Sequence, residues 1–282
     1  MKTTHREIAR DAIRSPAVAG MFYPASPDEL RNEVSQLLRG SAPATPATIL
    51  GGVVPHAGYM YSGMVAARFY LCLAERSIPL AVIISPSHRV YFDGISVFCG
   101  AAYRTPLGDM PVDQQVAEQL LSRGAPFVNS WDGHTGEHAL EVQLPFLQVL
   151  CPSLLIVPVV MGDQRGELCE ALGEAIADIL FERPGLILAS SDLSHYHSHD
   201  DAEQMDRRVL ECVSELAPHR LLDCLQRGEA EACGGGPIAA AMIAARALGA
   251  TSGEILDYAD SSAVSGDTAS VVGYLAAAFC KS

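Results

Sequence analysis

Four short apolar runs, each followed by a turn, constrain the fold of this chain more than any other feature. They span residues 49–54, 80–84, 154–160 and 186–189, and Pro, Ser or Gly follows each of them. Short runs of this kind, rich in Val, Ile and Leu, are typical of strands that are buried on both faces of a sheet. We therefore predict a sheet that is covered by helices on its two faces.

Segments with helical periodicity lie between these runs. The clearest begins at Ser26, where Pro27 and two acidic residues form an N-terminal cap, and it ends near Gly40. We predict a loop over residues 41–48 and a final strand within residues 269–279, and helices over residues 63–76, 112–123, 136–145, 167–180, 200–216 and 237–248. The alternation predicts one α/β domain over residues 1–282, whose first 15 residues form an irregular arm.

Composition and charge exclude several classes of protein. The chain has 19 Lys and Arg against 33 Asp and Glu, a net charge of −14 that repels nucleic acid. No apolar run approaches the roughly 20 residues that a membrane span needs, and no apolar segment near Met1 indicates a signal peptide. The eight cysteines form no CxxC pair and are expected to be thiols in a reducing compartment. We therefore expect a cytoplasmic protein.

Ionisable side chains follow three of the predicted strands. His56 comes after the first run, His88 after the second, and Asp192 and His195 after the fourth. Ligands of open α/β sheets bind beyond the carboxyl ends of the strands, so these side chains are expected to converge. Imidazole and carboxylate groups in one crevice suit a divalent transition metal such as iron, zinc or copper. The alternative for each residue taken singly is a solvated loop position.

Two further segments carry candidate functional groups. Cys233 lies in a glycine-rich turn before a helix, where a helix N-terminus favours the thiolate, although an inert buried cysteine is the alternative. Glu137 and Glu141 are one helical turn apart, with His138 beside them. These carboxylates would orient a metal-bound imidazole or act as a general acid or base, or else form a solvated first turn.

Taken together, these motifs resemble those of one known family. They are residues 15–24 (SPAVAGMFYP), 55–63 (PHAGYMYSG), 85–88 (SPSH), 137–146 (EHALEVQLPF), 190–196 (SSDLSHY), 233–238 (CGGGPI) and 266–274 (GDTASVVGY). They are similar to the motifs of the MEMO family, named for the mediator of ErbB2-driven cell motility and including microbial relatives. The microbial members are often called protein B of the AmmeMemoRadiSam system, beside an AMMECR1-like protein and a radical SAM enzyme.

The resemblance implies a fold and a site. The fold would be that of the class III, LigB-type extradiol dioxygenases, a three-layer α/β/α arrangement with a mostly parallel or mixed sheet. The metal ligands would be His56, His88 and Cys233, where the extradiol enzymes have a carboxylate as third ligand. The other residues implied at the pocket are Asp192, His195, Glu137, His138 and Phe22. The animal proteins have Trp at the position of Phe22, so their phosphotyrosine-peptide binding is not carried over.

Three functions are therefore weighed. The first is a non-haem redox protein that binds iron, with copper or zinc as alternatives. In it His195 is the general acid or base, oriented or charge-tuned by Asp192, for a small or peptide-borne substrate. The second is a non-catalytic scaffold that partners a radical SAM enzyme and an AMMECR1-like protein. The third is a hydrolase in which Cys233 is the nucleophile and His195 the base.

Overall fold

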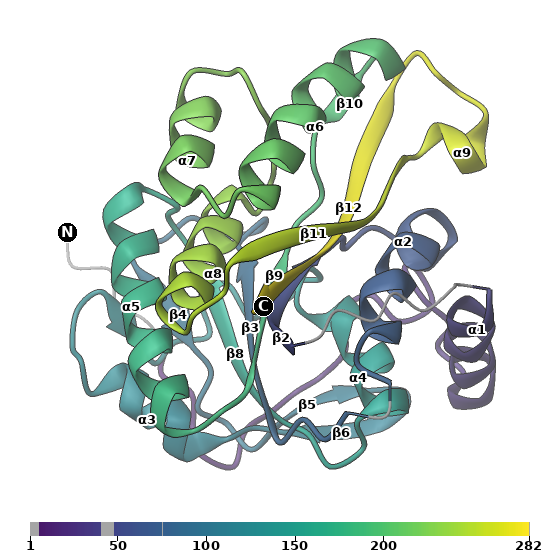
Figure 1. The fold of residues 1–282 in the computed structure, drawn as a ribbon. Coiled ribbons are helices and arrows are strands. Elements are labelled where there is room, and N and C mark those ends of the chain that lie inside the picture. The colour runs from purple at the N-terminus through teal and green to yellow at the C-terminus, as the bar shows by residue number, and fades with distance from the viewer. Residues whose placement is uncertain (1–5, 41–47, 75, 282) are drawn as a thin grey trace.

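The computed structural model describes residues 6–40, 48–74 and 76–281 (Figure 1). Its strands are β1 (Ile13–Arg14), β2 (Thr48–Val54), β3 (Leu80–Pro86), β4 (Ile95–Val97), β5 (Ala102–Thr105), β6 (Gly108–Pro111), β7 (Phe127–Val128), β8 (Leu155–Met161), β9 (Leu186–Ser190), β10 (His195–His197), β11 (Ser252–Asp260) and β12 (Val271–Lys281). Its helices are α1 (Pro27–Arg39), α2 (Tyr59–Leu71), α3 (Gln114–Leu121), α4 (Leu144–Leu150), α5 (Gly166–Glu182), α6 (His199–Ser214), α7 (Pro218–Gln226), α8 (Gly235–Ala247), α9 (Ser262–Ser265) and the short 3-10 helix η1 (Glu141–Gln143). The loop predicted over residues 41–48 lies outside the described residues, apart from Thr48.

The main sheet is mixed, with a parallel centre. Its strands run in the order β10-β12-β2-β9-β3-β8-β4-β7, and β11 pairs with β12. Strands β2, β9, β3 and β8 are mutually parallel, whereas β12 joins β2 and β4 joins β8 in antiparallel fashion. The four parallel strands are the four apolar runs of the sequence, as expected for strands with no solvated face.

Helices cover both faces of this sheet. Along β3, Leu80, Val82 and Ile84 pack into one hydrophobic cluster, and Ala81 and Ile83 pack into the other, because successive side chains of a strand point to opposite faces. The first cluster is closed by α3, α5, α6, α7 and α8, and the second by α1, α2 and α4 together with the small sheet β1-β5-β6 (Figure 1). The predicted three-layer α/β/α fold is confirmed.

Two glycines allow the centre of the sheet to pack tightly. A Cβ on Gly52 would lie 2.2 Å from the Ala277 carbonyl oxygen and 2.2 Å from the Phe69 ring. A Cβ on Gly51 would lie 2.4 Å from the Ile187 carbonyl oxygen. Because any larger residue would push the neighbouring backbone away, these positions need glycine. The close packing fixes β2, whose carboxyl end leads into His56.

The structure corrects the helix that we predicted over residues 136–145. Gly136 has a φ of +74°, and the Glu137 side chain accepts hydrogen bonds from the amides of His138 at 2.8 Å and Ala139 at 2.9 Å. These contacts hold a turn, so helical structure begins only at Glu141. Glu137 and His138 therefore precede the helix and are not on one of its faces.

Other differences are smaller. The helix expected from residue 63 begins at Tyr59, and α7 and β11 were not predicted. Residues 6–12 of the arm are irregular, but Ile13–Arg14 pair with β5 and Arg14 is buried. Within the described part of the chain, every helix is too short or too polar to cross a lipid bilayer.

Candidate metal centre

Polar side chains follow the carboxyl ends of three neighbouring parallel strands and lie at one edge of the sheet. β9 lies between β2 and β3 in the strand order. His56 follows the end of β2, Asp192 follows the end of β9, and His88 follows the end of β3. The predicted convergence at the carboxyl ends of the strands is therefore found.

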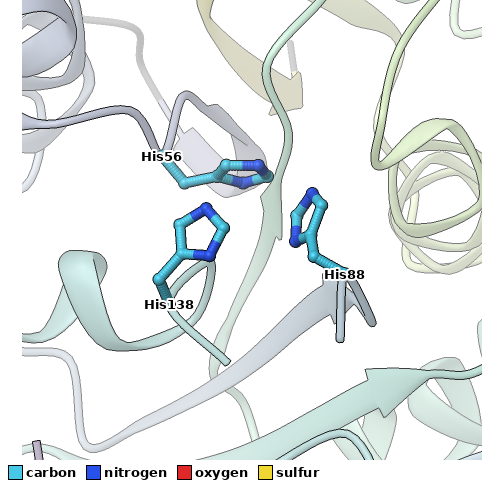
Figure 2. A group of neighbouring side chains, drawn as sticks. All are labelled: His56, His88 and His138. Carbon is cyan, nitrogen blue, oxygen red and sulfur yellow. The ribbon is translucent and has the colours of Figure 1, made fainter. Parts of the chain in front are cut away.

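His56, His88 and His138 form a group of three imidazoles. Among the described residues they are the one set of three or more such side chains whose potential ligand atoms all lie within 4.8 Å of one another. The ring centroids are 5.1 Å apart for His56 and His88, 5.3 Å for His56 and His138, and 4.7 Å for His88 and His138. Figure 2 shows the three rings around a common space, with His138 arriving from a separate segment.

Glu137 holds two of these imidazoles. Its carboxylate accepts hydrogen bonds from the His88 amide at 2.6 Å and from His88 Nδ1 at 2.9 Å, besides those from the amides of His138 and Ala139. Burial opposes ionisation of Glu137, but the imidazoles of His138 and His88 outweigh it and hold the pKa of the carboxyl well below its ordinary value. Glu137 is therefore a buried anion that fixes the ring of His88.

His56 is buried, and Ser190 and Asp192 fix its position. Its Nδ1 lies 3.0 Å from Ser190 Oγ, and its amide donates to Asp192 Oδ1 at 2.6 Å. Burial, together with the neighbouring His88 and His138, lowers the pKa of His56 well below its ordinary value. The ring is therefore neutral at physiological pH, and neutral imidazole is the form that binds metal ions.

These donors fit a divalent transition metal. Three imidazoles are a recognised ligand set for zinc, and imidazole also suits iron and copper. The buried Nδ1 of His138 has no hydrogen-bond partner among the described residues, although Glu137 Oε1 lies 3.2 Å away without the alignment of a hydrogen bond. A buried polar atom without a hydrogen-bond partner destabilises the fold. A cation bound to the three imidazoles would offset this cost at His138. The donor set does not distinguish between these metals.

Cys233 lies beside this group and is not one of its three members. Its Sγ is 3.1 Å from His56 Nε2 and accepts a hydrogen bond from the Asp192 amide at 3.3 Å. Burial of the thiol, reinforced by the Asp192 charge, raises the pKa of Cys233, which is the reverse of the shift we expected at a helix N-terminus. The first amides of α8 are already used, since Gly234 donates to Ser191 Oγ and Gly236 to Gln164 Oε1. Ligation by Cys233 stays a prediction.

Asp192 and His195 lie at the same edge. Asp192 is buried, and burial raises the pKa of its carboxyl, although the His56 amide opposes the shift. His195 is partly exposed at the start of β10, and its ring packs edge-on against Tyr196 at 5.8 Å. Within the described contacts, Asp192 makes no hydrogen bond to His195, and the charge of His195 opposes the rise in the pKa of Asp192.

A cavity of about 490 Å³ opens over these side chains. Phe22 forms part of its wall and packs on His138 with ring centroids 4.9 Å apart. The cavity is lined by Met21, Phe22, His56, Ala57, Gly58, Tyr61, His88, His138, Asp192, His195, Tyr196, Val272 and Tyr274. A larger cavity of about 750 Å³ between α5, α7 and α8 shares none of these side chains.

Glu141 does not belong to the site. It is fully buried and pairs with Arg14, and it also accepts hydrogen bonds from the Ala17 amide at 2.7 Å, the Val18 amide at 3.1 Å and the Tyr23 hydroxyl. The expected shared face with Glu137 is therefore wrong. Sequence reasoning missed the pair with Arg14, which no local pattern marks. It also gave no role to Ser190, although this residue begins the 190–196 motif.

Comparisons with known proteins agree with the motifs. A MEMO1 family protein of Methanopyrus kandleri is 41% identical over 94% of this chain and 98% of its own length. A MEMO1 family protein of Methanothermobacter thermautotrophicus is 39% identical over 93% of this chain and 98% of its own length. A crystal structure of an uncharacterised protein from Escherichia coli K12 superposes with a TM-score of 0.54 at 14% identity, over 81% of this chain and 99% of that one, and supports the fold alone. The profile of the family described as Memo-like protein matches residues 14–278. The chain therefore belongs to the Memo-like protein family.

Proposed function

We propose that this protein is a non-haem metal-binding redox protein, with iron as its metal and copper or zinc as alternatives. The observation that carries the proposal is the group of three imidazoles at the ends of the central strands. His56, His88 and His138 would hold the metal, and Cys233 would supply a further donor. When bound, the metal would provide a Lewis acid and a redox centre in a partly water-excluded cavity.

The other residues of the cavity have separate roles in this proposal. His195 is partly exposed on the cavity wall, where a substrate proton would reach its ring. His195 opposes the rise in the pKa of the Asp192 carboxyl, so the two groups interact through their charges. Glu137 keeps the His88 ring in place. The substrate would be a small molecule or a peptide-borne group that fits a cavity of about 490 Å³.

Metal content after anaerobic purification tests this function. We expect stoichiometric metal in the parent, an iron or copper signal by electron paramagnetic resonance, and loss of tight binding in His56→Ala. His219→Ala is the matched control, because His219 is exposed and pairs with Glu170 away from the site. A His56→Ala protein that binds the metal as tightly as the parent would overturn the proposal.

A scaffold role is the second candidate, and exposed apolar side chains favour it. Met21, Tyr61 and Tyr196 line the cavity, yet they are 72%, 38% and 79% exposed. Such side chains are enriched where proteins bind one another. Co-purification with a radical SAM enzyme and an AMMECR1-like protein tests this role. Capture that is unchanged in His88→Ala, without any metal-dependent product, would favour the scaffold over the enzyme.

The hydrolase alternative has little support. The imidazole beside Cys233 is that of His56, not His195, and burial raises the pKa of the thiol. Burial therefore opposes the thiolate form that a nucleophilic cysteine needs. The eight cysteines all lie among the described residues and form no disulfide bond, which supports the further proposal of a cytoplasmic location.

A further inference from the structure

A buried hydrogen-bond network lies behind His56, and Gln143 is its centre. The side-chain nitrogen Nε2 of Gln143 lies 2.9 Å from the carbonyl oxygen of Pro55. Because a carbonyl oxygen can only accept, this contact fixes which end of the amide is the NH₂ group. The Oε1 atom then accepts from the Tyr70 hydroxyl at 2.7 Å. The two hydrogens of Nε2 go to its nearest acceptors, the Pro55 carbonyl oxygen and Ser190 Oγ at 2.8 Å, and the Ala139 carbonyl oxygen at 3.4 Å is a longer third contact.

Ser190 has one hydrogen, and its direction is also determined. Ser190 Oγ lies 2.6 Å from the Ala139 carbonyl oxygen, a contact that only a hydrogen on the serine can fill. The hydroxyl accepts from Gln143, so its remaining capacity is as an acceptor. His56 Nδ1 lies 3.0 Å from the same oxygen. The hydrogen between His56 and Ser190 must therefore be carried by His56 Nδ1.

We propose that Ser190 and Gln143 are positioning residues that hold His56 in its Nδ1–H tautomer and so aim the lone pair of Nε2 at the three-imidazole group. The direction of every bond follows from two backbone carbonyls, those of Pro55 and Ala139, which cannot donate. Ser190 and Gln143 are 0% and 1% exposed, so water does not compete for their bonds. The network acts on the metal through His56 and touches no substrate.

The same arrangement recurs at His88. Its Nδ1 faces the carboxylate of Glu137, which accepts only, so the hydrogen again lies on Nδ1 and the lone pair on Nε2. The neutral hydroxyl of Ser190 accepts the Nδ1 hydrogen of His56, as the Glu137 carboxylate accepts that of His88. In the metal-free protein, the Cys233 thiol lies 3.1 Å from His56 Nε2, and the Asp192 carbonyl oxygen at 3.5 Å is a second acceptor for its hydrogen.

Nitrogen-15 NMR of the metal-free protein measures the tautomer directly. With histidine labelled at the ring nitrogens, the His56 signals are identified by their loss in His56→Gln. We expect a protonated Nδ1 and an unprotonated Nε2 in the parent, and a changed tautomer ratio in Ser190→Ala. Ser190→Thr keeps the hydroxyl and should keep the parent tautomer. A proton on Nε2 of His56 in the parent would overturn the inference, whatever the variants do.

Ser85→Ala is the matched control. Ser85 lies near the end of the neighbouring strand β3, is equally buried, and has an Oγ without a hydrogen-bond partner among the described residues. Ser85→Ala removes a serine Oγ, as Ser190→Ala does, but not the one that contacts His56. The tautomer of His56 should therefore not change. If Ser190→Ala and Ser85→Ala give the same His56 signals, the network does not set the tautomer and the inference fails.

Zinc titration gives the second readout, and this part rests on the proposed function. Loss of a group that orients a metal-bound histidine typically weakens metal binding about 10–100-fold. We expect that loss for Ser190→Ala with Zn²⁺ alone and less than a twofold change for Ser85→Ala. Equal affinities of the two variants would overturn the role in metal binding. A parent that binds no Zn²⁺, Fe²⁺ or Cu²⁺ yet shows the Nδ1–H tautomer would refute the proposed function and leave the tautomer assignment standing.

Discussion

Replacement of Glu141 by glutamine would measure how much stability is lost when the buried Arg14–Glu141 ion pair is broken. This pair attaches the N-terminal segment to the rest of the fold. Arg14 and Glu141 are 2% and 0% exposed. Arg14 also donates to the carbonyl oxygens of His134, at 3.1 Å, and Glu137, so it cannot turn to solvent when its anion is removed. Ala17 and Val18 donate to different oxygens of Glu141, Oε2 and Oε1, so glutamine keeps the shape but an acceptor for only one of these amides. The substitution therefore removes the charge together with one of the two amide hydrogen bonds.

The magnitude follows from this burial. Breaking a buried pair by removing one partner typically costs about 3–5 kcal/mol, because an uncompensated charge stays inside. The unfolding entropy of roughly 2.1 cal/mol/K per residue gives about 0.6 kcal/mol/K for 282 residues. We therefore expect the melting temperature of Glu141→Gln to fall by about 5–8 °C.

Denaturation by guanidinium, followed by the fluorescence of Trp131, the single tryptophan, measures the free energy of unfolding. Glu118→Gln is the control, since Glu118 pairs with Arg10 on the surface, where the side chains are 49% and 70% exposed. Such a pair contributes no more than about 1 kcal/mol. If Glu141→Gln costs no more than Glu118→Gln, the reasoning about a buried charge is refuted.

Three further outcomes are expected. Burial, reinforced by the Arg14 cation, lowers the pKa of His134 to about 3, so the unfolded chain binds a proton between about pH 6.5 and 3 that the folded protein does not. The free energy of unfolding should therefore decrease as the pH is lowered through that window, by up to about 1.4 kcal/mol per pH unit. In His134→Gln, equilibrium unfolding should show a smaller change of this free energy with pH. Glu137→Gln should weaken Zn²⁺ binding about 10–100-fold by calorimetry, and unchanged affinity would argue against its role as an orienting anion. Gly52→Ala should lower the free energy of unfolding by at least about 1–3 kcal/mol, since its Cβ would lie 2.2 Å from neighbouring atoms, and a neutral result in denaturant would contradict that packing.

The sequence alone was enough to predict the layers of the fold and one edge of the site. Apolar runs and helical periodicity depend on neighbouring residues, and burial on both faces of a sheet leaves a continuous apolar signature in β2, β3, β8 and β9. The position of His56 and His88 follows from the same signal, because parallel strands end at a common edge. The helix over 136–145 was wrong because a side-chain contact of Glu137 overrides the local helical pattern.

Only the tertiary structure decided how the site is completed. His56 and Ser190 are 134 positions apart in the chain, and Arg14 and Glu141 are 127 apart. Nothing in local periodicity joins such pairs. The family resemblance implied His138 at the pocket, but only the structure makes it the third member of the imidazole group and separates Glu141 from the site. The pKa of Cys233 likewise depends on burial and on which amides are already bonded. Local pattern determines the strands and their ends, whereas the surroundings of each polar atom are set by distant segments that the fold brings together.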